Sequence, residues 1–265
     1  YVHGYSQRES LRLGDQATTL AELLHHDQRY PDGSLVLEAG CGVGAQTVFL
    51  AGNNPKVSFV SVDISPASLE HAKTAVQGAG FSNVQFQQAD LFHLPFADNT
   101  FDAVFVCFVL EHLSEPLKAL AELKRVVKPG KIITAIEGDH GSAYFYPDSA
   151  FARRAIQCLV DLQAAAGGDA LIGRRLYPLL TGAGFENVSV SPRVVYVDSS
   201  RPQWVEGFTR NTFTAMVEGV GKQAIASGMM DSASWKQAVA DLYRTAEADG
   251  VFNYTFFKAT GVKLA

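Results

Sequence analysis

The chain lacks several patterns that mark particular classes of protein. It has no run of about 20 apolar residues, the length needed to cross a bilayer, so we expect no membrane span. Its net charge is −5 and its basic residues are scattered, whereas nucleic-acid binding needs a concentrated basic surface. Short basic pairs such as Lys124 with Arg125 are interpreted as solvated helix faces. These absences argue against a membrane protein and against a nucleic-acid-binding protein.

Cysteine is scarce as well. Cys41, Cys107 and Cys158 are odd in number and have neither metal-ligand nor redox-pair spacing. We therefore expect reduced thiols and a cytoplasmic protein. The chain opens on Tyr1 rather than on methionine, which leaves open a targeting segment ahead of it.

Short apolar runs alternate with helical patterns through the first two-thirds of the 265 residues. The runs cover residues 35–37, 57–62, 84–86, 101–106 and 132–136. They lack strict polar alternation, which is typical of strands covered on both faces. Ser65 and Pro66 begin one helix, which Gly78 and Gly80 end. Strand and helix in repeated alternation predict a doubly wound α/β fold with a mostly parallel sheet.

A further helix is predicted between two of these strands, and the last third of the chain has a different pattern. Glu115 and Pro116 begin that helix, and residues 128–130 end it. Residues 148–182 and 201–248 have helical character. Extended runs at 188–197, with Pro192 inside, and at 254–257 predict a late antiparallel pair at the sheet edge.

A glycine-rich turn follows the first predicted strand and opens a helix. It reads LEAGCGVG over residues 37–44, with glycine at 40, 42 and 44. Glycine lets the backbone turn sharply and approach a ligand closely, and the amides that open the helix favour polar groups. The turn alone would also suit NAD or FAD, or a packing turn without a ligand.

Acidic residues near three predicted strand ends decide between these ligands. Asp63 ends the second strand, where a carboxylate can accept the hydroxyls of a ribose, although it could also be a helix N-terminal acid. Asp90 follows the third strand, beside an expected adenine pocket. Glu38 precedes the glycines and would repel a dinucleotide pyrophosphate, whereas it would attract a sulfonium and an ammonium group. The charges therefore favour S-adenosylmethionine as the cofactor.

In these segments the chain resembles the class I S-adenosylmethionine-dependent methyltransferases, and most of all the branch of ubiquinone, menaquinone and other small-molecule methyltransferases. The resemblance is carried by residues 37–44, 62–65, 89–90, 94–96, 101–102, 110–113 and 127–130. It implies a seven-stranded Rossmann-like sheet with helical cap insertions. Lys131 departs from it, because many members have a second glycine there.

The resemblance also implies roles for single residues. Gly40, Gly42 and Gly44, with Cys41 between them, would shape the loop around the methionine part, and Glu38 would hold its amino group. The other implied cofactor-binding residues are Asp63 for the ribose, Ile64 and Leu91 with Asp90 for the adenine, and Cys107 near the sulfonium. Cys107 could equally be a core residue. A leading segment, residues 4–9, would fold over the cofactor, with Arg8 or Arg12 on its carboxylate.

The acceptor side is expected where the fifth strand ends, at residues 137–142. His140 is the candidate base, because its pKa suits proton transfer near neutral pH, and Asp139 is its neighbour. Both could instead cap the next element. Adjacent residues rarely converge on one ion, so no metal site is expected. Five residues of the late helices could line an apolar pocket or form the core of a cap: Trp204, Phe208, Phe213, Met216 and Tyr243.

Together these observations predict three parts. Residues 1–30 form a helical segment over the cofactor site, 31–147 the α/β core that binds it, and 148–265 the cap insertions and late strands. The expected activity is methyl transfer to oxygen, nitrogen or carbon of a small-molecule acceptor. A cofactor-binding regulatory protein without transfer and an NAD-dependent oxidoreductase are the alternatives. The oligomeric state is left open.

Overall fold

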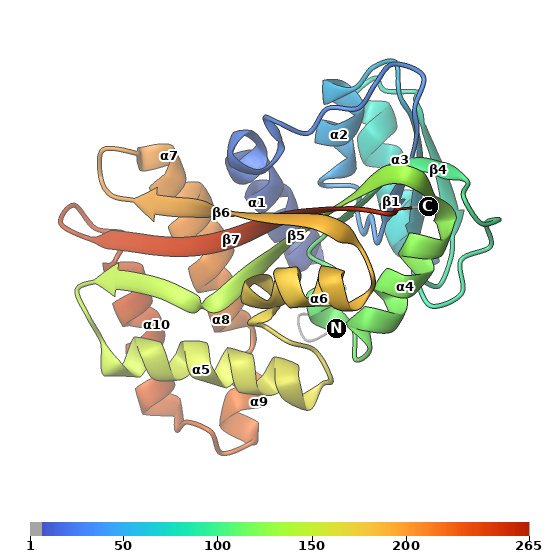
Figure 1. Ribbon diagram of the computed structural model, residues 1–265. Coiled ribbons are helices and arrows are strands. Elements are labelled where there is room, and N and C mark those ends of the chain that lie inside the picture. Colours follow the sequence, from blue (N-terminus) through green and yellow to red (C-terminus); the bar gives the residue numbers. More distant parts are fainter. Residues whose placement is uncertain (1–6, 265) are drawn as a thin grey trace. The chain divides into compact units, whose positions relative to one another are not determined.

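The computed structural model describes the backbone of residues 7–264 and the side chains of residues 16–264 (Figure 1). The predicted leading segment begins before this range, and the side chains of Arg8 and Arg12 lie outside the described residues. That part of the prediction is not addressed by the structure.

Seven strands form one sheet in the order β3-β2-β1-β4-β5-β7-β6. The strands are β1 (Leu35–Ala39), β2 (Ser58–Asp63), β3 (Val84–Gln88), β4 (Phe101–Cys107), β5 (Val127–Tyr146), β6 (Glu186–Val197) and β7 (Val251–Val262). Neighbours from β3 to β5 pair in parallel, and β7 is antiparallel. This order confirms the predicted doubly wound, mostly parallel sheet and its late edge strands.

Helices connect the strands. The α-helices are α1 (Gln7–His25), α2 (Thr47–Asn53), α3 (Pro66–Gly78), α4 (Pro116–Val126), α5 (Ala150–Ala165), α6 (Leu176–Gly182), α7 (Pro202–Trp204), α8 (Ala215–Gly219), α9 (Gly221–Ala226) and α10 (Ser232–Arg244). Two short 3-10 helices, η1 (Leu110–His112) and η2 (Ile172–Arg175), and a π-helical segment, η3 (Val205–Thr214), complete the set. No helix within residues 7–264 combines the length and apolar character needed to span a bilayer.

Local sequence explains where the helices of the first half begin and end. The Ser65 hydroxyl accepts a hydrogen bond from the Ser68 amide at 3.2 Å, and Pro66 fills the first position of α3. Gly80, with φ +80°, follows the end of that helix. Pro116 likewise opens α4. The predicted helix starts at Ser65 and Glu115 are therefore correct.

The fifth strand differs from the prediction. It was expected over residues 132–136, with its end at Glu137, but β5 runs from Val127 to Tyr146. Residues 128–130, expected to end a helix, lie in this strand where its pairing with β4 is shifted. Gly138 and Gly141 indicate a strand end in the sequence, yet the strand continues through both. Asp139 and His140 therefore lie within a strand and not at its end.

The chain divides into two compact units. The first, here called the parallel-sheet unit, contains Ala21–Glu137, Gly173–Pro192 and Phe257–Ala265. The second, the helical unit, contains Gly138–Ile172, Arg193–Phe256 and the start of the described chain as far as Leu20. The predicted division at residues 30 and 147 stays a prediction.

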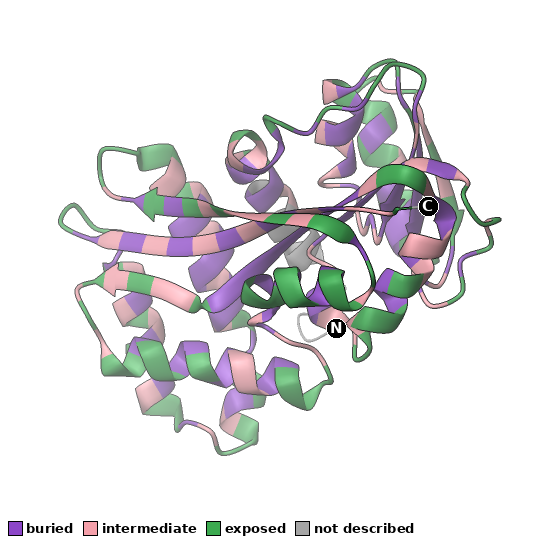
Figure 2. Ribbon diagram, viewed as in Figure 1, coloured by how far each residue is buried: buried purple, intermediate pink, exposed green. Residues whose placement is uncertain are grey.

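Each unit has its own core, coloured as buried in Figure 2. In the parallel-sheet unit the core consists of the central strands, where Val104, Phe105 and Ile133 are fully buried. In the helical unit it is a cluster of aromatic rings from η3 and β7: Phe208, Phe213, Phe252, Tyr254 and Phe256. Phe208 and Phe213, which the sequence offered for a pocket or a core, are core residues at 1% exposure.

Candidate functional site

The glycine-rich turn joins β1 to α2 and is fixed by the neighbouring strand. The amides of Gly40 and Cys41 donate to the Val62 carbonyl at 2.8 and 2.9 Å. Gly40, Gly42 and Gly44 have φ of +75°, +53° and +81°, in the left-handed region that favours glycine. The turn therefore needs glycine at all three positions for its backbone conformation.

The three glycines differ in what surrounds them. A Cβ atom on Gly40 would lie 2.5 Å from Cγ2 of Val109, and one on Gly44 would lie 2.8 Å from Cα of Ala72. A Cβ on Gly42 would meet no atom within 4 Å. The first and last glycines are thus required by packing against Val109, which precedes η1, and against α3, whereas the middle of the turn faces open space.

Asp63, the last residue of β2, is held at this turn by two backbone amides. Its Oδ2 atom accepts from the Gly42 amide and its Oδ1 atom from the Ser65 amide, both at 2.9 Å. These bonds fix the carboxylate between the glycine turn and the start of α3. Ile64 next to it is 62% exposed.

Glu38 is the penultimate residue of β1 and is only 2% exposed. The Ser61 hydroxyl donates to its Oε2 atom at 2.6 Å. Burial raises the pKa of Glu38 to about 7, hydrogen bonds from Ser61 and Thr47 oppose this rise, and the charge of Asp63 adds to it. The side chain is therefore ready to exchange a proton near neutral pH when a cation approaches.

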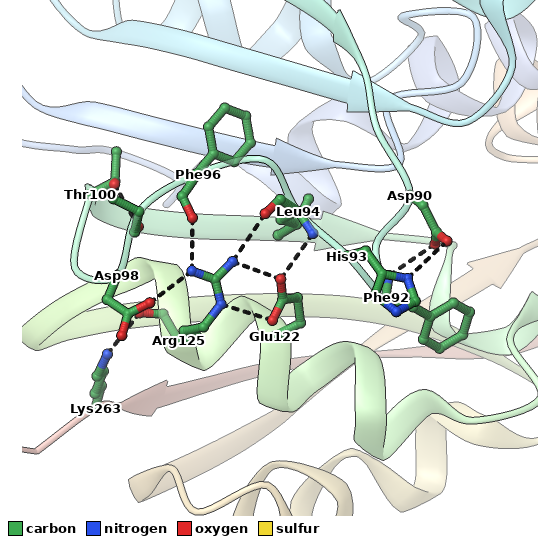
Figure 3. A network of polar contacts seen from close by, with 11 residues as sticks. Asp90, Phe92, His93, Leu94, Phe96, Asp98, Thr100, Glu122, Arg125 and Lys263 are labelled. Atoms are coloured by element: carbon green, nitrogen blue, oxygen red, sulfur yellow. Dashed lines mark hydrogen bonds and ion pairs between the residues drawn. The ribbon is translucent and has the colours of Figure 1, made fainter.

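Asp90 lies two residues after β3 and folds back on its own loop (Figure 3). Its Oδ1 atom accepts from the Phe92 amide at 2.9 Å, and Nδ1 of His93 lies 3.4 Å from Oδ2. Leu91, between them, is buried at 8% exposure. The loop places the Asp90 carboxylate at 44% exposure, accessible to a polar group.

Arg125 of α4 fixes the continuation of this loop (Figure 3). Its guanidinium donates to the carbonyls of Phe96 at 2.7 Å and Leu94 at 3.0 Å, and it pairs with Asp98 at 2.8 Å and Glu122 at 2.7 Å. The interpretation of Lys124 and Arg125 as a solvated helix face is therefore wrong for Arg125. Sequence reasoning missed it because its partners lie about thirty residues earlier in the chain.

Strand register brings the three predicted carboxylates to one edge of the sheet. β1 and β2 pair in parallel with Glu38 opposite Ser61, and β2 pairs with β3 with Asp63 opposite Gln88. Asp90 follows Gln88 by two residues. Because adjacent parallel strands end at the same edge, Glu38, Asp63 and Asp90 lie along the carboxyl ends of three neighbouring strands.

The cysteines predicted at this edge are buried and form no disulfide. Cys107 ends β4, and burial raises the pKa of its thiol well above the usual value, with further contributions from Glu137 and Glu38. Burial also raises the pKa of Cys41, which sits in the glycine turn. Both side chains are therefore thiols at neutral pH and not nucleophilic thiolates.

Asp139 and His140 belong to the helical unit and are buried at 3% and 6% exposure. Nδ1 of His140 lies 2.7 Å from the Tyr254 hydroxyl, and Oδ1 of Asp139 accepts from the Gly141 amide at 3.0 Å. Neither residue caps the next element, because β5 continues past both. The sequence did not indicate Tyr254, whose partner is 114 residues away.

No group of three histidine, cysteine or acidic side chains within the described part of the chain is arranged to hold a metal ion. The glycine turn, Glu38, Asp63 and Asp90 all lie at the carboxyl ends of β1, β2 and β3 within the parallel-sheet unit. Sequence reasoning missed a third residue besides Arg125 and Tyr254, because it gave Glu137 no role of its own. It is fully buried beside the loop that follows β4.

Residues 37–135 match the model of a methyltransferase domain family. A demethylmenaquinone methyltransferase of Clavibacter sepedonicus is 39% identical over 105 residues, which are 40% of this chain and 41% of that protein. The chain spans 34% to 54% of the length of the curated relatives that it matches. These sequence matches cover the segment in which the resemblance was found, and they confirm it.

Solved structures extend the likeness to nearly the whole chain. A phosphoethanolamine N-methyltransferase of Haemonchus contortus, solved with S-adenosylhomocysteine, superposes with a TM-score of 0.57 at 17% identity, covering 94% of this chain and 53% of that one. The [4+2]-cyclase SpnF superposes with a TM-score of 0.57 at 23% identity, covering 95% and 82%. At such identities these two structures show the shared fold alone.

Proposed function

Since this chain belongs to the class I S-adenosylmethionine-dependent methyltransferases through its domain at residues 37–135, we propose that it transfers a methyl group from S-adenosylmethionine to a small-molecule acceptor. One observation carries the proposal: three carboxylates stand along the carboxyl ends of β1, β2 and β3 beside a glycine turn whose middle is open at Gly42. A dinucleotide pyrophosphate would be repelled there, whereas a cationic nucleoside would be attracted.

The residues of this edge fit the parts of the cofactor. Glu38 would hold the ammonium group, and Asp63 the ribose hydroxyls, for which its oxygens keep acceptor capacity beyond their amide bonds. Ile64, exposed next to Asp63, offers an apolar surface to the adenine, with Asp90 and Leu91 on the following strand. Cys107 would lie near the sulfur atom. When bound, the cofactor supplies the methyl group as an electrophile.

His140 and Asp139 stay the proposed acceptor-side residues. His140 would accept a proton from an acceptor that arrives protonated, and its hydrogen bond with Tyr254 would orient the imidazole ring. Asp139, the preceding residue of β5, would contribute its buried carboxylate. An acceptor whose nucleophilic atom arrives without a proton to lose would need no base and would only have to be aligned with the methyl group.

Titration calorimetry with S-adenosylhomocysteine and with NADH tests the cofactor. We expect micromolar affinity for S-adenosylhomocysteine and no binding of NADH. Asp63→Asn should weaken S-adenosylhomocysteine by about 1–3 kcal/mol, because it removes a charged hydrogen-bond acceptor. Asp102→Asn is the matched control, because Asp102 accepts the Leu35 amide at the other end of β1 and should leave affinity unchanged. Preference for NADH would overturn the proposal.

Incubation with methyl-labelled S-adenosylmethionine and fractionated metabolites tests the transfer. Label should enter a small molecule, and His140→Ala should lower the turnover while sparing cofactor affinity. The second candidate function is a cofactor-binding protein without methyl transfer, which would keep the same glycine turn and the same carboxylates at Glu38, Asp63 and Asp90. Binding of S-adenosylhomocysteine with no labelled product from any fraction would support that candidate.

A further inference from the structure

Glu137 has no role in the proposed function, although it is buried beside the residues of the proposed cofactor site. It lies on β5 within the parallel-sheet unit and is fully buried. Its Oε1 atom accepts hydrogen bonds from the Val109 amide at 3.0 Å and the Leu110 amide at 2.8 Å. One carboxyl oxygen thus holds two successive amides of the loop that follows β4.

That loop has a backbone conformation that needs support. Phe108, directly after the end of β4, has φ +58°, which is rare for a residue other than glycine. Its amide donates to the Ile136 carbonyl at 2.9 Å. The loop is therefore held to β5 at three successive amides, two of them through Glu137. Without these bonds the left-handed residue could relax, and Val109 would move with it.

Val109 connects the loop to the glycine turn. The contact at Gly40 is so close that a single added Cβ would lie 2.5 Å from Cγ2 of Val109. Side chains in close contact transmit displacements because protein interiors are densely packed. If the hydrogen bond between Glu137 and the Val109 amide is lost, Val109 can move, and the glycine turn that contains Gly42 moves with it.

The surroundings of the second carboxyl oxygen of Glu137 indicate whether this side chain is charged or neutral. Oε2 is buried and has no hydrogen-bond partner among the described residues. Burial, followed by the nearby charge of Glu111, raises the pKa of Glu137 well above its usual value, and the bonds from Leu110 and Val109 oppose this rise only in part. An isolated buried carboxylate is costly, so the neutral acid is the form that fits this place.

We propose that Glu137 is a positioning residue of the cofactor site, which as an uncharged acceptor holds the loop after β4 so that Val109 closes on Gly40. The effect of Glu137 on cofactor affinity rests on the proposed function, because it presumes that the site binds S-adenosylmethionine. The hold itself is a property of the ligand-free protein and can be measured without any cofactor.

Three variants of the full chain test the inference. Glu137→Gln keeps a neutral acceptor oxygen, and Glu137→Ala removes it. Asp102→Ala is the control, because it removes another carboxylate that accepts a backbone amide, that of Leu35 at 3.0 Å, at the opposite end of the strands. The readouts are the exchange rates of the Val109 and Leu110 amides without ligand and the dissociation constant of S-adenosylhomocysteine.

We expect Glu137→Gln to match the wild type within about threefold in both readouts. Glu137→Ala should speed exchange of the two amides and weaken S-adenosylhomocysteine by about tenfold, corresponding to the loss of one buried hydrogen bond. Asp102→Ala should change neither. Unchanged exchange in Glu137→Ala, or a Glu137→Gln variant as impaired as Glu137→Ala, would overturn the inference.

Two further outcomes are separated by this design. A wild type that does not bind S-adenosylhomocysteine would refute the proposed function, while the exchange rates would still decide whether Glu137 holds the loop. If Glu137→Ala does not fold, the pH profile of affinity decides. The profiles of wild type and Glu137→Gln should coincide between pH 6 and 8 if Glu137 is neutral, and diverge if it is charged.

Discussion

The edge of the parallel-sheet unit and the interior of the helical unit hold their polar groups in different ways. At the edge, Asp63 is bound by the amides of Gly42 and Ser65, groups that lie within 21 residues of it. In the helical unit, His140 is bound by a hydroxyl 114 residues away, inside a cluster of aromatic rings. The first arrangement follows from strand ends and turns, and the second from long-range packing.

This difference has a functional consequence. A carboxylate fixed by backbone amides at a strand end keeps oxygen lone pairs that can receive a ligand, because two amides do not saturate it. A side chain inside an aromatic core is fixed as firmly but is separated from solvent, as the 6% exposure of His140 shows. The edge is therefore the better-supported binding site, and four variants can sharpen the comparison.

The largest effect is expected at the glycine turn. Gly44→Ala should destabilise the protein by about 3 kcal/mol, combining the cost of a left-handed alanine with overpacking against the backbone of Ala72. Chemical denaturation measures this free energy of unfolding. We also expect the variant to lose affinity for S-adenosylhomocysteine, because α3 must shift away from the turn.

Gly33→Ala is the control for this effect. Gly33 has φ +79° but open space around its Cβ position, so only the backbone cost of about 1 kcal/mol should appear. Equal losses in the two variants would mean that packing against α3 contributes nothing and that backbone strain alone explains the glycine turn.

The second effect concerns the pH dependence of stability at Glu38. Its pKa is about 7 in the folded protein and near 4.5 when unfolded, so the folded state binds the extra proton between these values. Stability from this group is complete below pH 4.5 and is lost as the pH rises through 7, by about 3 kcal/mol in total. Glu38→Gln should remove the loss, which denaturation curves from pH 4 to 8 would reveal.

His25 opposes this trend and must be separated from it. Burial lowers the pKa of His25 to about 4, so its contribution to stability is present above pH 6.5 and is lost as the pH falls toward 4. Because both proteins contain His25, the difference between wild type and Glu38→Gln isolates Glu38. A difference that does not vary with pH would show that Glu38 is already ionised in the folded protein.

The same contrast explains how much the sequence could predict. The glycine turn after the first strand, the position of Asp63 at the end of the second strand and the start of α3 at Ser65 were predicted correctly, because each depends on residues close in the chain. The doubly wound, mostly parallel sheet followed from the alternation of strands and helices, and its seven strands followed from the resemblance. The roles of single cofactor residues stay predictions, since their geometry fits but has not been tested.

What sequence reasoning missed depends on distant partners. The fifth strand was expected to end at residues 137–142, but Gly138 lies under the Tyr254 hydroxyl, which occupies the space where a Cβ would be. Pairing in the sheet therefore overrode a local signal, and β5 continues. Arg125 has the pattern of a solvated helix residue. Besides Glu122 on its own helix, its partners are Leu94 and Asp98 in a loop that only the fold brings to it.

The third effect tests the helical unit. Tyr254→Phe removes the hydroxyl bound to His140 but keeps the ring, and it should cost about 1–2 kcal/mol in stability, because a buried hydrogen bond is lost. Tyr243→Phe is the control, since the contact of its hydroxyl with Glu218 is longer, at 3.3 Å, and the residue is half-buried. It should cost less than about 0.5 kcal/mol. Equal losses of stability in the two variants would show that the His140–Tyr254 hydrogen bond stabilises the protein no more than the Tyr243–Glu218 contact does.

The smallest effect separates binding from stability. Ile64 is 62% exposed, so Ile64→Ala should change the free energy of unfolding by less than about 0.5 kcal/mol. If its side chain packs on the adenine, the variant should still weaken S-adenosylhomocysteine by about 1 kcal/mol, because the bound adenine would then leave more apolar surface in water. Val194→Ala, at 51% exposure on β6, is the matched control and should alter neither quantity. An unchanged affinity in Ile64→Ala would remove Ile64 from the site, whereas a loss confined to that variant would show why an apolar side chain is left in water at the end of β2.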